Sequence, residues 1–229
     1  MNVLLTGSTG FLGFRTLERL VQLPQVNLIV ATGRFLRASR KITDAKVNYV
    51  LGDLEDSSFV NSLLKNIDVV INTASLSSPW GTKDAFYTSN VVTQKNIINA
   101  AKKNGVKKFI YISTAHVYGS PLCGEIDETM PTYPAHHYSI THKVSEDYVL
   151  LKDSDDCMER VVFRLTNGVG SPVASDANCW MLVVNDLCKQ VAMNSEIKLR
   201  SDGSLQRDFI PISLICSVVH SAIASNAFD

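Results

Sequence analysis

The stretch NVLLTGSTGFLGFRTLERLVQL, residues 2–23, decides the fold. It opens with the apolar run 2–6, passes through three glycines, and continues in an apolar pattern of helical spacing that Pro24 stops. A strand, a glycine-rich turn and a helix in this order let the backbone approach a pyrophosphate, which the helix N-terminus stabilises. The stretch therefore predicts a dinucleotide site. The expected contacts in the turn are Gly7, Thr9, Gly10, Phe11, Leu12 and Gly13.

Five further apolar runs follow this stretch and alternate with helical patterns. Such β-α-β repeats build a parallel sheet, whose strands are buried on both faces and have continuous apolar residues. The sequence thus predicts an α/β fold, a Rossmann doubly wound parallel sheet. The expected later strands span residues 26–31, 47–51, 69–72, 108–113 and 160–165.

Helices are expected where apolar residues recur at helical spacing. They span residues 11–23, 57–64, 83–104, 137–152, 179–192 and 213–224. The pattern weakens after Leu165, and no linker separates two halves. We expect an NAD(P)-binding Rossmann domain at residues 1–165 and a small substrate-side lobe at residues 166–229.

Charge and cysteine usage favour small-molecule chemistry. Lys plus Arg and Asp plus Glu both number 22, so no single-sign field favours nucleic acid or a membrane surface. No segment approaches the roughly 20 apolar residues of a membrane span, and no leader pattern is present. The five cysteines contain no C-x-x-C pair, as is typical of reduced thiols without a metal. We expect a soluble, cytoplasmic protein with a small-molecule substrate, no metal, and no nucleic-acid or membrane partner.

The end of the second strand selects the cofactor. A carboxylate there binds the adenosine ribose 2′-hydroxyl, whereas an arginine accommodates a 2′-phosphate. The chain has Arg34 in Ala31-Thr-Gly-Arg34 and no Asp or Glu at this point. This favours NADP over NAD as the cofactor. The alternative is that Arg34 belongs to a solvated basic loop with Arg37 and Arg40.

The third strand leads into Gly52-Asp53-Leu54, which puts a carboxylate beside the expected adenine pocket. Asp53 and Leu54 are therefore candidate cofactor contacts. Asp53 fits equally well as the N-cap of the following helix, because its side chain is one that helix N-termini prefer.

Taken in order, several motifs resemble those of the extended short-chain dehydrogenase/reductase family of NAD(P)-dependent epimerases and dehydratases. The resemblance covers nearly the whole chain, although the last part is shorter than is usual for the family. The motifs are Gly7-x-x-Gly10-x-x-Gly13, Asp53-Leu54, Asn72-Thr-Ala-Ser75, Asn90 followed by Asn96, Ser113-Thr-Ala-His-Val-Tyr-Gly119, Tyr138, Arg164-Leu-Thr-Asn-Gly-Val-Gly170 and Arg207-Asp-Phe-Ile210.

The resemblance implies a catalytic set. Thr114, with Ser113 beside it, corresponds to the hydroxyl that polarises the reacting oxygen, and Tyr138 corresponds to the acid/base. Hydride transfer at a carbinol carbon needs such a group to take or give the oxygen's proton. The resemblance also implies that the cofactor contacts Thr73, Ala74, Ser75, Asn90 and Tyr138. The alternatives are an ordinary strand-end hydroxyl pair and a tyrosine that only packs on the sheet.

One position departs from the family pattern. The family has a lysine four residues after the tyrosine, but Tyr138-Ser-Ile-Thr-His142-Lys143 has a histidine there and the lysine one residue later. On a helix, four residues return to nearly the same face and five do not. We expect His142 to take the lysine's place as a catalytic and cofactor contact with less electrostatic help, and Lys143 to face away. The alternative is that His142 is an exposed helix residue.

The substrate should bind at the carboxyl ends of the strands. Ser77, Asn167 and Arg207 are the candidate contacts, with Arg207 meeting a substrate phosphate or, alternatively, pairing with Asp208. We expect an oxidoreductase or epimerase/dehydratase that transfers hydride, with a nucleotide sugar as the first substrate to test. The alternative is a catalytically weak, NADP-binding regulatory or scaffold protein.

A homodimer is the expected assembly, because family members often pair the long helix with the tyrosine-bearing one. Apolar residues are available for this pairing on both helices, although the same residues would also suit the core. They are Phe86, Val91, Ile97, Ile140, Val144 and Leu151.

Overall fold

A six-stranded parallel sheet forms the centre of the computed structural model, which describes residues 1–77, 81–154, 156–194, 196–199 and 201–225. Its order is β3-β2-β1-β4-β5-β6, and every neighbouring pair is parallel. This confirms the predicted doubly wound α/β fold. The strands are β1 (Asn2–Thr6), β2 (Leu28–Thr32), β3 (Val47–Tyr49), β4 (Val69–Asn72), β5 (Lys108–Thr114) and β6 (Glu159–Leu165).

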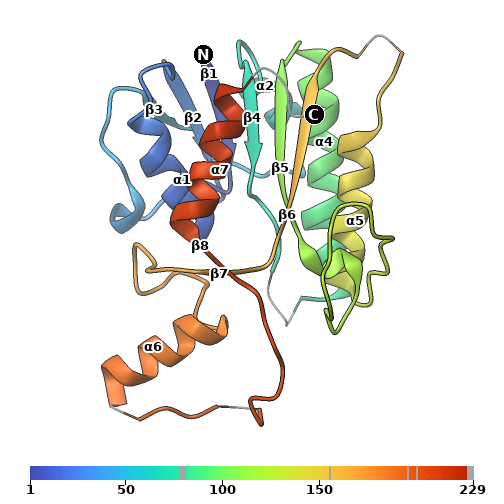
Figure 1. Cartoon of the computed structure of the whole chain (residues 1–229). Helices are drawn as coiled ribbons and strands as arrows, with labels where there is room; N and C mark the ends of the chain where they lie inside the picture. Colours follow the sequence, from blue (N-terminus) through green and yellow to red (C-terminus); the bar gives the residue numbers. More distant parts are fainter. Residues whose placement is uncertain (78–80, 155, 195, 200, 226–229) are drawn as a thin grey trace.

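Helices cover both faces of the sheet (Figure 1). One face carries α1 (Phe11–Val21) and α7 (Ile212–Ala224), which pack on each other and share a core with β1, β2 and β4. The other carries α2 (Ser57–Leu63), α4 (Thr93–Lys103) and α5 (His137–Leu150). The central strands are buried from both sides, which explains their continuous apolar residues.

The expected long helix at 83–104 is divided into three. The chain forms α3 (Lys83–Phe86), a π-helical turn (Tyr87–Val92) and α4. The prediction of one uninterrupted α-helix was therefore wrong. The spacing of apolar residues does not reveal a π-helical turn, which has one more residue in each hydrogen-bonded turn than an α-helix. π-Turns of this kind often occur at functional sites, and this one carries Asn90.

The C-terminal third has two short strands that the sequence pattern did not predict, together with the helix that was expected at residues 179–192. Short strands β7 (Asn167–Val169) and β8 (Phe209–Pro211) pair in parallel, and α6 (Val183–Asn194) lies away from the sheet (Figure 1). In contrast, α7 packs on the main sheet beside α1. The division at residue 165 stays a prediction, but α7 belongs to the helix layer of the first domain.

The strand order reverses between β1 and β4, which are neighbours in space but not in sequence. Ligands of open α/β sheets bind in the crevice that such a reversal opens at the carboxyl ends of the strands. The glycine turn follows β1 at this edge, and residues 73–77 follow β4. The fold thus places two predicted cofactor segments side by side.

Candidate active site

The glycine turn contacts the segment after β4 closely. Gly7 has a φ of +67°, a left-handed conformation that glycine adopts readily. A Cβ atom on Gly7 would lie 2.8 Å from Thr73 Oγ1 and 2.9 Å from the backbone nitrogen of Ala74. A Cβ atom on Gly13 would lie 2.1 Å from the carbonyl oxygen of Gly7. Only glycine at both positions allows the turn and the β4 loop to lie this close together.

The N-terminus of α1 is available to a ligand. Gly10 is its N-cap, and within the described ranges no side chain caps it. Gly10 is exposed, and the nearest non-neighbouring atom to a Cβ there is the Gly7 carbonyl oxygen at 3.2 Å. Thr9, Phe11 and Leu12 are half-buried beside it. Uncapped N–H groups and the positive end of the helix dipole fit a pyrophosphate, so the cradle suits the predicted cofactor.

The segment after β3 is held at the edge of this crevice. Asn96 Nδ2 on α4 donates to the carbonyl oxygens of Leu54 at 3.1 Å and Glu55 at 2.9 Å. Asp53 is exposed, while the N-cap of α2 is Asp56, whose carboxylate accepts two backbone N–H groups. The alternative role of Asp53 as the cap was therefore wrong. Among the described residues, the Asp53 carboxylate accepts a hydrogen bond from the Glu55 N–H, in its own turn, at 3.0 Å.

The basic loop after β2 is tied to the C-terminal third. Arg37 and Arg40 both form ion pairs with Asp176, the second at 2.7 Å, and Arg40 also donates to the carbonyl oxygen of Thr9 at 2.8 Å. The hydrogen bond from Arg40 is the main cause that lowers the pKa of Asp176. Arg34 is exposed and forms no ion pair within the described part of the chain. Among the described residues, Arg34 is thus the arginine of this loop whose guanidinium has no competing carboxylate.

Asn90 holds the loop after β4 against α5. Its side chain is 3% exposed; Oδ1 accepts from the Leu76 N–H at 2.7 Å, and Nδ2 donates to Thr141 Oγ1 at 3.0 Å. Thr73 Oγ1 donates to the Thr6 carbonyl oxygen at 2.7 Å, which fixes the start of the same loop. Asn90 therefore positions the 73–77 loop, of which Ser75 is exposed. A direct cofactor contact by Asn90 stays a prediction.

The four predicted catalytic residues lie together. Ser113 and Thr114 end β5 and are buried, and Tyr138 and His142 lie one turn apart on α5, which packs on β5. The Thr114 hydroxyl acts on that of Tyr138 and lowers its pKa, and the ring centroids of Tyr138 and His142 are 4.5 Å apart. His142 is 1% exposed, so its alternative as a surface residue was wrong.

Burial sets the charge of this cluster. It raises the pKa of Tyr138, and the hydrogen bond with Thr114 offsets the rise only in part. It lowers the pKa of His142 to about 3, so the imidazole is neutral at physiological pH. Lys143 pairs with Asp147 on the outer side of α5, as the helical spacing predicted. The cation that the family resemblance implies beside the tyrosine is therefore not supplied by α5.

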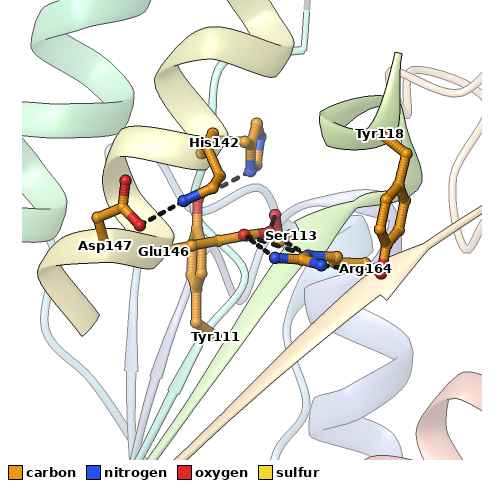
Figure 2. Close-up of polar contacts among 8 residues, drawn as sticks. Tyr111, Ser113, Tyr118, His142, Glu146, Asp147 and Arg164 are labelled. Carbon is orange, nitrogen blue, oxygen red and sulfur yellow. Dashed lines mark hydrogen bonds and ion pairs between the residues drawn. The ribbon is translucent and has the colours of Figure 1, made fainter. Parts of the chain in front are cut away.

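A buried ion pair anchors Ser113 (Figure 2). Glu146 on α5 is 0% exposed and accepts from Ser113 Oγ at 2.5 Å and from Arg164 Nη2 at 2.8 Å. Arg164 Nη1 donates to the Tyr118 hydroxyl at 2.8 Å. Ser113 thus positions the strand end, which leaves Thr114 as the hydroxyl that reaches Tyr138. Glu146 was not among the predicted site residues; the signal that could have found it is a carboxylate one helical turn after His142.

The α5 N-terminus depends on a histidine that sequence reasoning gave no role. His136 is the N-cap: its Nδ1 accepts from the Ser139 N–H at 3.2 Å. Its ring stacks beside Tyr138, with centroids 6.1 Å apart, and faces His116 at 5.4 Å. His136 therefore positions the first turn of the helix that carries Tyr138. Its unusual identity for a cap explains why a search for Ser, Thr, Asp or Asn misses it.

A cleft of about 1270 Å³ lies between β6, the loop after β5 and residues 204–208. Asn167 and Arg207 both line it, as expected for substrate contacts, whereas Ser77 does not. Asn167 Nδ2 donates to the Asp208 carbonyl oxygen at 2.9 Å. Arg207 is exposed, and among the described residues it forms no ion pair with Asp208. Residues 78–80, which follow Ser77, lie outside the described residues.

The reversal of strand order, the glycine cradle and the Thr114–Tyr138 pair together define a dinucleotide-binding protein of the short-chain dehydrogenase/reductase type. The profile of the NAD dependent epimerase/dehydratase family matches residues 3–227. The chain belongs to this family.

Individual relatives agree with this assignment. The chain is 28% identical over 232 residues to UDP-glucose 4-epimerase of Lactobacillus helveticus, covering 99% of this chain and 61% of that protein. It is 32% identical over 193 residues to dTDP-glucose 4,6-dehydratase of Streptomyces antibioticus, covering 74% of this chain and 54% of the relative. The chain thus spans little more than half the length of these curated relatives.

Solved structures share the fold. UDP-glucuronic acid 4-epimerase of Bacillus cereus, in complex with UDP-glucuronic acid and NAD, superposes with a TM-score of 0.86 at 22% identity, over 99% of this chain and 74% of that one. DesIV of Streptomyces venezuelae, a dTDP-glucose 4,6-dehydratase with NAD bound, gives a TM-score of 0.86 at 19% identity, over 98% and 72% of the two chains.

Proposed function

We propose that the chain binds a nicotinamide dinucleotide and transfers hydride to or from a carbinol or carbonyl carbon of a small molecule, with a nucleotide sugar as the first substrate to test. The observation that carries the proposal is the cradle of Gly7 and Gly13 at the strand-order reversal, with Tyr138 of α5 packed against the end of β5 that carries Thr114. The names of the relatives support the substrate class.

The crevice residues fit the cofactor by chemistry. The glycine turn and α1 would hold the pyrophosphate, Asp53 and Leu54 the adenosine end, and residues 73–75 the middle. Tyr138 and His142 would contact the nicotinamide ribose. When bound, the nicotinamide ring accepts or donates the hydride.

Thr114 and Tyr138 would have different roles at the substrate oxygen. Thr114 would hydrogen-bond this oxygen and hold it beside the tyrosine hydroxyl. Tyr138 would take the proton when the alcohol is oxidised and return it when the ketone is reduced. The Ser113 hydroxyl donates its hydrogen bond to Glu146, so its role would be to position the end of β5 and not to contact the substrate. Asn167 and Arg207 in the adjoining cleft would contact the substrate, Arg207 through a phosphate.

Titration with NAD⁺ and NADH tests cofactor binding. Gly10→Val is expected to abolish binding, because the valine side chain would project into the open approach to the uncapped α1 N-terminus. Isothermal calorimetry measures the affinity, and thermal unfolding followed by circular dichroism shows that the variant is folded. A folded Gly10→Val protein that binds NAD⁺ as tightly as the unmodified chain would contradict the pyrophosphate site.

The preference for NADP is a separate proposal that rests on Arg34. Removing a charge-assisted hydrogen bond to a 2′-phosphate should lower NADP⁺ affinity about tenfold or more in Arg34→Ala, with NAD⁺ affinity unchanged. The matched control is Arg37→Ala in the same loop, whose guanidinium already pairs with Asp176. Calorimetric titration of both variants with both cofactors decides. Equal losses for NAD⁺ and NADP⁺ in Arg34→Ala argue against a phosphate contact.

A catalytically weak, cofactor-binding regulatory or scaffold protein is the second candidate function. The neutral His142, in the place of the family's lysine, is the observation that favours it. Stoichiometric cofactor binding without turnover of nucleotide sugars or other secondary alcohols, even at pH 9, would select this candidate.

A homodimer through α4 and α5 stays a proposal, but fewer of the expected residues are available for the interface. Phe86, Val91 and Ile97 are buried in the monomer, so they are core positions. Ile140 and Leu151 are 41% and 59% exposed and remain available to a partner. Light scattering of the purified chain measures the mass.

The cytoplasmic location also stays a prediction. Among the described residues, no helix has the length and apolarity to cross a membrane.

A further inference from the structure

Tyr111 approaches His142 from beneath the site. Tyr111 lies on β5, is 1% exposed, and its hydroxyl oxygen is 2.8 Å from His142 Nδ1 (Figure 2). The two rings stack with centroids 5.8 Å apart and planes 21° apart. Both groups are buried, so this hydrogen bond is protected from exchange with water. It links the strand that ends in Thr114 with the helix that carries Tyr138.

Both partners of this hydrogen bond are uncharged, so the tautomer of His142 and the direction of the bond go together. Burial raises the pKa of Tyr111 far above the usual phenol value, so the phenol keeps its proton and is able to donate it to His142 Nδ1. Burial also keeps His142 neutral. The nearest carboxylate on α5, that of Glu146, is engaged by Ser113 and Arg164. A neutral imidazole has one donor and one acceptor nitrogen, so an accepting Nδ1 puts the ring proton on Nε2.

The other nitrogen of the ring has no partner. His142 Nε2 is buried, and no described residue forms a hydrogen bond with it. A buried donor without an acceptor is costly and uncommon in folded proteins. The ring lies edge to face with Tyr138 at 4.5 Å, within the proposed catalytic cluster. A ligand that brings a hydroxyl oxygen into this cluster would satisfy the donor.

We propose that Tyr111 is a positioning residue that holds His142 in the Nε2–H tautomer, so that a neutral imidazole donates a hydrogen bond to a ribose hydroxyl of the bound dinucleotide. This inference rests on the proposed function. The proposal gives the site a hydrogen-bond donor that carries no charge, whereas a lysine at this position would supply both a donor and a positive charge. It also gives a role to a tyrosine hydroxyl that is buried in β5 beneath α5.

Nitrogen NMR of the histidine side chains tests the tautomer directly. In ¹⁵N-labelled protein at pH 7, a His142→Gln variant assigns the His142 signals among those of the five histidines. In the expected Nε2–H tautomer, the protonated nitrogen correlates with both ring C–H protons. Tyr111→Phe should produce a mixture of tautomers or the Nδ1–H form. Tyr148→Phe removes a hydroxyl from the same helix, α5, at a residue that does not contact His142. This variant should leave the tautomer of His142 unchanged.

Addition of NAD⁺ tests the ligand. The Nε2–H resonance of the unmodified chain should shift on binding, and Tyr111→Phe should weaken NAD⁺ affinity roughly two- to tenfold, as expected for one hydrogen bond. An Nδ1–H tautomer in the unmodified chain, or an unchanged tautomer in folded Tyr111→Phe, overturns the inference. Binding of NAD⁺ without a shift overturns the ribose contact. Absence of NAD⁺ binding overturns the proposed function instead, while the tautomer of the free protein is still measured.

Discussion

Exchange of Tyr138 for phenylalanine is expected to lower turnover by about 10²- to 10⁴-fold, the usual contribution of a positioned acid/base. The phenol is the group beside the end of β5 whose pKa Thr114 lowers, and phenylalanine removes its proton-carrying oxygen while keeping the ring. The ring contacts with Phe86 and His142 should survive, so the fold and the cofactor affinity should change little. The measurement is the rate of NAD(H)-linked conversion of a nucleotide sugar at saturating cofactor.

Tyr148→Phe is the matched control for this prediction. Tyr148 lies on the same helix, is half-buried, and its ring packs beneath Lys95 on the side of α4. Its turnover should equal that of the unmodified chain. If Tyr138→Phe binds cofactor normally and retains turnover within about twofold, the acid/base is another group, and the role of Tyr138 in packing α5 on the sheet is its whole function.

The pH profile is expected to be steep and alkaline. In the direction of alcohol oxidation, Tyr138 must lose its own proton before it can accept the proton of the substrate hydroxyl. Burial raises the pKa of Tyr138 above the usual value near 10. His142 is neutral and does not lower it. The phenolate fraction, and with it turnover, should therefore rise about tenfold per pH unit between pH 7 and pH 9.

His142→Lys is expected to move this profile toward neutral pH. A unit positive charge roughly 5 Å from the phenol, at an effective dielectric of about 20, is worth about 3 kcal/mol, or about two pKa units. Turnover at pH 7 should then rise by about 100-fold. His142→Gln, which is uncharged, serves as the control for the loss of the imidazole, and thermal unfolding checks that both variants fold. A flat profile in the unmodified chain would show that proton transfer does not limit turnover.

The sheet was predictable because its signal is local. Apolar runs, the glycine turn and Pro24 each act through neighbouring residues, and they correctly predicted six strands and the helix α1. The positions of Thr114, Tyr138 and His142 followed in the same way, since a strand end and one helical turn fix them. The helix at 83–104 failed because a π-turn is stabilised by contacts made at a distance, such as those from Asn90 to Leu76 and Thr141.

By itself, the sequence determined the class of fold, the glycine-rich turn after the first strand, and the replacement of the family's lysine by His142. Only the tertiary structure decided the chemical state of these groups. Glu146 meets Arg164 from another element, Arg37 and Arg40 meet Asp176 more than 130 residues away, and Tyr111 meets His142 across the interface of β5 and α5. Charge, tautomer and hydrogen-bond partner depend on burial and on neighbours that are remote in sequence, so no local pattern contains them.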